Sequence, residues 1–254
     1  MIDHLILFFI SLVANTFSAF SGGGAGLVQF PLLIFLGLSF SIALATHKVA
    51  SVALGFGAIL RYLTTSQLER QFVLMLLIAG LPGVILGGNL ILFVPEKIAI
   101  LSLGILTGSL GLYSIFKPSL GLEHRTDNRH VKGYVYGSLV LFLLGILNGS
   151  LTSGSGLFVT LWLIAWFGLD YKRAVAYTLI LVGLFWNGAG AVTLAMLTDI
   201  RWDWMPALLL GSLTGGYLGS HLAIKHGNRW IKRAFEIVTL LISMKLIWTG
   251  IFSV

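Results

Sequence analysis

Two clusters of glycine and serine interrupt apolar sequence about half a chain apart. They are Ser21-Gly22-Gly23-Gly24-Ala25-Gly26 and Ser153-Gly154-Ser155-Gly156. Such clusters break a helix, and glycine lets a ligand approach the backbone closely. Where a helix restarts after the break, its free N–H groups and its dipole bind anions. The chemistry expected here is anion binding by backbone groups, with serine hydroxyls as further donors.

Polar side chains near the two clusters could add to this chemistry. Thr46, His47 and Lys48 follow the first cluster, Asn148 precedes the second, and Thr178 follows it. A lysine at membrane depth costs roughly 2.5–3.5 kcal/mol to insert, and such residues usually have a function. Lys48 could pair with an anion, and His47 could titrate in proton coupling. The alternatives are a snorkelling lysine and a hydrogen-bonded interfacial histidine.

Composition sets the class of protein. The 254 residues are 57% hydrophobic and only 10% charged, whereas a soluble domain has roughly 25% charged residues. We therefore predict an all-α integral membrane protein. The chain has no cysteine, which excludes disulfides and thiolate metal sites, and we predict no metal and no cofactor. The first residues lack a basic region before their apolar run, so we expect a membrane segment there rather than a cleaved signal peptide.

Ten apolar stretches follow one another along the chain. They are 4–20, 26–42, 43–61, 71–93, 97–116, 133–151, 156–169, 173–197, 205–224 and 231–252. Several approach the ~20 residues that span a bilayer. The first two are shorter, as are the sixth and seventh, and a glycine-serine cluster joins each of these pairs. Each pair is expected to form a helix–break–helix hairpin that enters the membrane and turns back.

The two halves of the chain are related by a constant offset. Adding 131 to a residue number gives its counterpart, as with Gly23 and Gly154, Gly37 and Gly168, and Gly88 and Gly219. Chance matches are easy among glycines, but a constant offset over a long stretch indicates duplication. We expect one integrated membrane domain, with an N-terminal repeat over 1–116, a cytoplasmic linker over 117–132 and a C-terminal repeat over 133–254.

The basic residues predict how the chain is oriented. If the linker is cytoplasmic, twelve of the sixteen Lys and Arg residues lie on that side, as the positive-inside rule requires. Each half then makes an odd number of net crossings. The repeats are therefore expected to be inverted, each with a hairpin and three transmembrane helices, giving eight to ten membrane segments and two periplasmic termini.

The net charge of +7 is explained by this topology, and we expect no nucleic-acid partner. The expected partners are the lipid bilayer and a small anionic substrate, and a homodimer is a further possibility. The basic stretch from Lys225 to Arg233 is interpreted as a positive-inside anchor. Its alternative role is binding of anionic lipid headgroups.

Inverted hairpins would bring their tips together near the middle of the membrane, and an anion site could form between them. The alternative is that the glycine clusters are kinks or helix-packing contacts. Asn187 could line the same cavity or pack between helices. The predicted substrate-binding residues are Ser21, Gly22, Gly23, Gly24, Thr46, His47, Lys48, Asn148, Ser153, Gly154, Ser155, Gly156 and Thr178.

These residues resemble a known family. The first cluster followed by Pro31, Gly37 and Ala45-Thr46-His47-Lys48 is similar to the N-terminal repeat of the sulfite exporter TauE/SafE family. The stretch from Asn148 to Gly156, followed by Gly168 and Thr178, is similar to its C-terminal repeat. The resemblance implies a multi-pass transporter of sulfur-containing anions in the bacterial inner membrane. Family members often carry an asparagine at the place of His47 and a lysine at the place of Leu179, and this chain departs from both patterns.

The resulting hypothesis is alternating-access transport of a small sulfur-containing oxyanion such as sulfite, thiosulfate or an organosulfonate. A passive anion channel is the main alternative, because a constriction lined by backbone groups also suits conduction. A cation or metal transporter would need buried carboxylates, and the candidates Glu69, Asp170 and Glu236 fall near predicted helix ends. Ser155 with His221 superficially resembles an intramembrane serine protease, but the rest of that pattern is absent, so we predict no enzyme.

Overall fold

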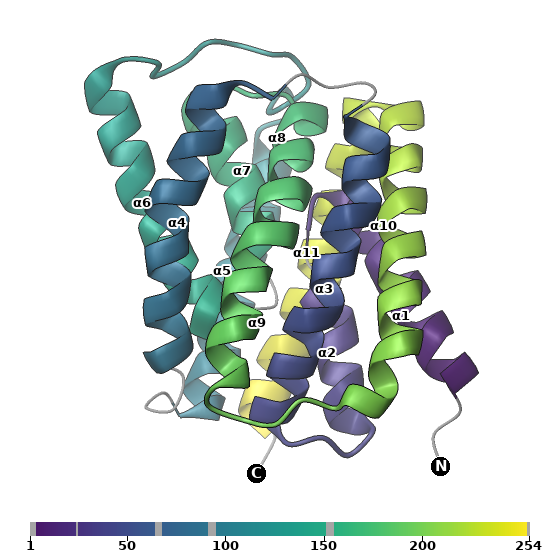
Figure 1. The fold of residues 1–254 in the computed structure, drawn as a ribbon. Coiled ribbons are helices and arrows are strands. Elements are labelled where there is room, and N and C mark those ends of the chain that lie inside the picture. The colour runs from purple at the N-terminus through teal and green to yellow at the C-terminus, as the bar shows by residue number, and fades with distance from the viewer. Residues whose placement is uncertain (1–3, 24, 64–67, 91–94, 151–154, 253–254) are drawn as a thin grey trace.

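A computed structural model describes residues 4–23, 25–63, 68–90, 95–150 and 155–252. Within these ranges every regular element is helical, and seven helices are long and apolar enough to cross a membrane. The helices run roughly along one common axis and form a single bundle (Figure 1). The prediction of an all-α membrane protein is therefore confirmed.

The helices follow one another in the order that the apolar stretches predicted. The first half contains α1 (His4–Ser21), α2 (Ala25–Phe35), α3 (Phe40–Tyr62), α4 (Arg70–Leu90) and α5 (Glu96–Phe116). The second half contains α6 (Val131–Ser150), α7 (Ser155–Phe167), α8 (Tyr171–Tyr177), the π-helix η2 (Thr178–Trp186), α9 (Asn187–Ala195), the short η3 (Trp202–Trp204), α10 (Met205–His226) and α11 (Asn228–Phe252).

The two halves pack through equivalent surfaces. Helix α1 packs mainly on α10, and α4 packs mainly on α6. By the offset of 131 residues, α6 is the counterpart of α1 and α10 is the counterpart of α4, so the same contact is made twice. Helix α5 packs on its own counterpart α11, and α3 packs on η2. Every main contact thus joins one half of the chain to the other.

The start of α1 and the end of α11 lie at the lower end of the bundle in Figure 1, and the linker between α5 and α6 lies at the upper end. Helix α2 occupies the lower half of the bundle, whereas α7 occupies the upper half (Figure 1). The inversion of the repeats and the repeat boundaries at 116 and 133 stay predictions.

Each hairpin has one long arm and one short arm, where the sequence suggested two short ones. Helices α2 and α7 have 11 and 13 residues, about 16–20 Å at 1.5 Å per residue, which is too short for a ~30 Å hydrocarbon core. Helices α1 and α6 are long enough to cross. Their polar residues do not break them, because the hydroxyls of Thr16 and Ser150 donate to the carbonyls of Leu12 and Ile146 one turn earlier.

The short arms end at glycines that the repeat had already paired. Gly37 and Gly168 have φ values of +95° and +70°, a left-handed conformation that glycine adopts at little cost. The N–H group of Leu38 bonds to Leu33 O five residues back, as in a Schellman cap, and that of Leu169 bonds to Leu163 O six residues back. Helix α2 therefore ends at Phe35 rather than at the predicted residue 42.

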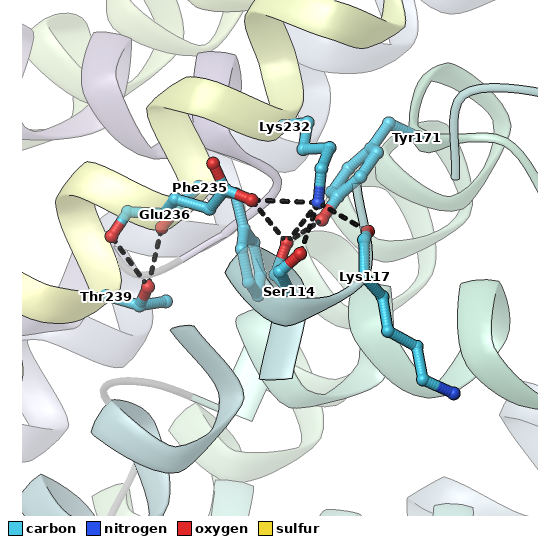
Figure 2. Close-up of polar contacts among 7 residues, drawn as sticks. All are labelled: Ser114, Lys117, Tyr171, Lys232, Phe235, Glu236 and Thr239. Carbon is cyan, nitrogen blue, oxygen red and sulfur yellow. Dashed lines mark hydrogen bonds and ion pairs between the residues drawn. The ribbon is translucent and has the colours of Figure 1, made fainter. Parts of the chain in front are cut away.

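A buried polar cluster fastens α11 to the end of α5 (Figure 2). The ammonium of Lys232 donates to Ser114 O at 2.6 Å and to Ser114 Oγ at 2.9 Å, and it lies 2.8 Å from Glu236 Oε1. The Ser114 carbonyl, in the last turn of α5, also accepts from the backbone N–H of Lys117 at 3.2 Å, and Lys232 supplies a second, charged donor. Within the Lys225–Arg233 stretch, this lysine is therefore a buried helix cap and not a surface anchor.

Candidate functional site

A polar cavity of about 40 Å³ lies where the two hairpin tips meet α3 and η2. One water molecule needs roughly 10–15 Å³ on this measure, so the cavity has room for a ligand of a few atoms. Its lining comes from both halves of the chain: Ser18, Gly23, Ala25, Gly26, His47, Ser51, Leu54, Asn148, Ser155, Gly156, Thr178, Leu179, Val182, Gly183 and Asn187.

The two tips touch each other through their backbones. Gly22 and Gly23 have φ values of +94° and +128°, which favour glycine. A Cβ atom on Gly23 would lie 2.8 Å from the carbonyl carbon of Gly156, and one on Gly22 would lie 2.8 Å from Val175 Cγ2. Conformation and close approach therefore both require glycine at this tip.

Both short helices begin at the cavity. Ala25 and Gly26 open α2, Ser155 and Gly156 open α7, and all four line the space. The first N–H groups of a helix have no partner within the helix, and its N-terminus carries a partial positive charge. The cavity is therefore bordered by two positive helix ends that come from different halves of the chain.

Lys48 of α3 is fully buried directly behind this cavity. Its ammonium donates to Asn148 O at 2.7 Å, to Asn148 Oδ1 at 2.6 Å and to Asn187 Oδ1 at 3.1 Å. All three acceptors are neutral amide oxygens, and among the described residues no carboxylate forms an ion pair with Lys48. Asn148 lies in the last turn of α6, whose carbonyls carry a partial negative charge that stabilises the ammonium.

His47 lies in the interior of the bundle and not at an interface. Its Nδ1 lies 2.7 Å from Gln29 Oε1, and its Nε2 lies 3.1 Å from Ser51 Oγ. Gln29 continues the chain of contacts, because its Nε2 donates to Ser11 Oγ at 2.9 Å. The imidazole is therefore fixed between α2 and α3 at the wall of the cavity.

The second half makes the equivalent contact with different residues. The offset of 131 takes Gln29 to Thr160 and His47 to Thr178. The hydroxyls of Thr160 and Thr178 are 2.8 Å apart, and Thr160 also donates to Gly22 O at 2.6 Å. A polar bond between the short hairpin arm and the next helix thus occurs in both halves, and in the second half it also holds the opposite tip.

The equivalent helices differ in winding. Helix α3 is a regular α-helix, and its cavity residues His47, Ser51 and Leu54 follow an α-helical spacing. Its counterpart is π-helical from Thr178 to Trp186, and single π-turns in α-helices often mark functional sites. There the cavity residues are Thr178, Val182, Gly183 and Asn187.

The structure brings together six of the predicted site residues at the cavity wall: Gly23, His47, Asn148, Ser155, Gly156 and Thr178. Gly22 and Lys48 lie directly behind the wall. Ser21 does not line the cavity and donates to Phe17 O in its own helix, and Thr46 points elsewhere and accepts from the backbone N–H of Arg201. Gly24, Ser153 and Gly154 lie outside the described residues.

Sequence reasoning missed two residues that organise the site. Gln29 and Thr160 were not predicted, although the offset of 131 pairs them and both are polar residues in apolar helices. That pairing of two buried polar positions is the signal that could have identified them.

The fold and the cavity define a class: a multi-pass membrane protein with a polar site built from both halves of its chain. The sulfite exporter TauE/SafE family matches residues 7–246. The chain therefore belongs to this family, and it is a membrane transporter.

The chain is similar, over nearly its whole length, to proteins that are named as probable membrane transporters. The chain is 27% identical over 244 residues to a "Probable membrane transporter protein" of Haemophilus influenzae, covering 96% of this chain and 94% of the relative. It is 25% identical over 243 residues to YfcA of Escherichia coli K12, covering 96% and 89%. It is also 25% identical over 277 residues to YunE of Bacillus subtilis, covering 99% and 100%.

Proposed function

We propose that this protein is a secondary transporter that carries a small sulfur-containing oxyanion across the bacterial inner membrane. The observation that carries the proposal is the fully buried Lys48 ammonium, whose partners among the described residues are all neutral oxygens. An unpaired charge in the interior is costly. An anion in the adjacent cavity would supply the missing negative charge.

The tips of the hairpins support an anion in particular. The N-termini of α2 and α7 both border the cavity, and each presents a positive dipole end that favours an anion. Within the described residues, no group of three or more acidic, histidine or cysteine side chains could hold a metal ion. The site therefore favours an anion over a metal cation.

The name of the family supports the choice of a sulfur oxyanion. The family is described as one of sulfite exporters, and the cavity of about 40 Å³ suits small anions. Sulfite, thiosulfate and short organosulfonates are therefore the proposed substrates.

Alternating access is proposed to use two inverted halves. The start of α1 and the end of α11 lie at the end of the bundle opposite to the linker (Figure 1), and most Lys and Arg residues lie in segments on the linker's side. The positive-inside rule then makes the linker cytoplasmic and the termini periplasmic. Rocking of one half against the other would expose a fixed central site to each side in turn.

Uptake of labelled sulfite, thiosulfate and a small sulfonate into proteoliposomes tests the proposal directly. The expected result is saturable uptake that unlabelled sulfite inhibits and that protein-free liposomes do not show. Folded, reconstituted protein that moves none of these anions would refute the proposal. Uptake that rises without saturation would instead indicate a passive anion channel.

A further inference from the structure

The orientation of two asparagine side chains follows from the ammonium between them. Lysine has only donors, so an amide that contacts it must turn its oxygen toward it. The Lys48 ammonium donates to the Oδ1 atoms of both Asn148 and Asn187. The Nδ2 groups of the two asparagines must therefore point away from Lys48, and both residues line the cavity.

The two amide nitrogens differ in how they are used. Asn148 Nδ2 donates to Ser155 Oγ at 2.7 Å, so it is engaged at the start of α7. Asn187 Nδ2 donates no hydrogen bond to any residue in the described part of the chain. It is therefore a neutral N–H donor at the cavity wall. The contact of Asn187 Oδ1 with the Lys48 ammonium fixes its orientation.

The winding of η2 explains why Asn187 reaches the cavity. Nine residues separate Thr178 from Asn187, which is about 2.5 turns of an α-helix and would place them on opposite sides. A π-helix has roughly 4.4 residues per turn, so nine residues make about two turns and return to the same side. The observed wall residues Thr178, Val182, Gly183 and Asn187 follow this longer period.

We propose that Asn187 binds the transported anion through Nδ2 and that Lys48 positions it there. This inference rests on the proposed function and names the residue that selects for oxyanions. An oxygen of the anion accepts the Asn187 N–H, while the positive N-terminal ends of α2 and α7 stabilise its other oxygens. Lys48 attracts the anion through the amides without touching it and is therefore a positioning residue.

The test compares Asn187→Ala with a matched control in proteoliposomes. Asn89→Ala is the control, because Asn89 is also an asparagine in a membrane helix but is exposed, and among the described residues it donates only to Ile85 O in its own helix. Asn187→Ala should raise the KM for sulfite or thiosulfate about 10-fold or more, since a hydrogen bond to a charged group is lost. Asn89→Ala should leave it within about twofold, as surface changes usually do.

Asn187→Asp keeps the size of the side chain and gives Lys48 a carboxylate. The variant should fold, because the new carboxylate neutralises the uncompensated charge of Lys48. It should not take up the anion, because the same carboxylate repels it. Competition by chloride gives a readout that a merely structural role would not move. If Asn187 selects oxyanions, chloride should inhibit uptake by the Asn187→Ala protein more strongly, relative to the wild type.

Failure of this inference can be told apart from failure of the proposed function. Wild-type protein that transports no sulfur oxyanion would refute the proposed function. Wild-type uptake with an unchanged KM and unchanged chloride competition in Asn187→Ala would overturn the role of Asn187 alone. Uptake at the wild-type rate by Asn187→Asp would overturn it as well.

Discussion

The indole ring of Trp186 occupies the space that any side chain at Gly80 would need. A Cβ on Gly80 would overlap the ring, which is fully buried, and the indole Nε1 donates to Leu76 O of α4 at 2.9 Å. Trp186 is the last residue of η2 and directly precedes Asn187. Helix α4 thereby fixes the end of the π-helical segment.

Gly80→Ala should displace Trp186 and disturb the cavity at a distance. We expect a loss of about 1–3 kcal/mol, as is typical of an overpacked core, together with reduced uptake. The loss is measured as a lower unfolding temperature in detergent. Trp186→Phe provides more space, so the double variant Gly80→Ala/Trp186→Phe should be more stable than additivity of the single variants predicts. Strict additivity would contradict the direct contact.

Gly23→Ala should abolish transport, because the tip of the first hairpin would be pushed away from α7. Gly37→Ala is a matched control: its φ is also positive at +95°, but no atom lies within 4 Å of the added Cβ. The control should lose about 1–2 kcal/mol of stability through backbone strain and keep its uptake. Equal loss of uptake in both variants would show that strain, and not the contact between the tips, is responsible.

Lys48→Met should strongly reduce uptake while leaving the protein folded. The substitution removes the buried charge that attracts the anion, and it frees both asparagines to rotate. We expect the KM to rise at least about 10-fold, since the attraction of a buried positive charge for a nearby anion is lost. Thr46→Val, two residues away but directed at Arg201 N, should change the KM little. A snorkelling lysine would instead give unaltered kinetics.

Lys232→Met should destabilise the contact between α5 and α11 (Figure 2). It leaves Glu236 without a cation and removes a charged donor from the carbonyls of Ser114 and Lys117, which keep only the backbone N–H groups of Lys117 and Leu120. Removing one partner of a buried pair typically costs about 3–5 kcal/mol, and thermal unfolding in detergent measures it. Lys232→Met/Glu236→Gln should recover part of the loss. A surface anchor would show no such recovery.

Much of the fold could be predicted because its signals are simple. Apolar length and the constant offset predict the order of the helices, and Gly37 and Gly168 mark the ends of the short arms. The candidate site was harder to predict from a run such as Thr46-His47-Lys48. Successive residues of a helix point about 100° apart, so these three cannot all face one cavity. In the structure His47 lines it, Lys48 lies behind it and Thr46 faces Arg201.

The position of Asn187 depends on the π-helical winding of η2, which the spacing of apolar residues in the sequence does not indicate. Reading η2 as an α-helix places Asn187 opposite Thr178, and only the longer turn of the π-helix brings it to the cavity. Leu179 stands where the repeat pairs it with Lys48, so the charge of the site is asymmetric. The residues that bind Lys48 are asymmetric as well: Asn148 and Asn187 accept from its ammonium, and their counterparts in the first half are Phe17 and Phe56.

The exchange of partners between the two halves has a consequence for biogenesis. Helix α1 leaves the ribosome first, but its main neighbour α10 is synthesised about 200 residues later. Until the second half has been synthesised, the interface of the first half therefore faces lipid. The glycines of that interface then lack the helices that they contact in the final structure. We therefore expect the two halves to assemble after insertion, so that two separately expressed halves divided within 117–130 associate in one membrane and restore uptake.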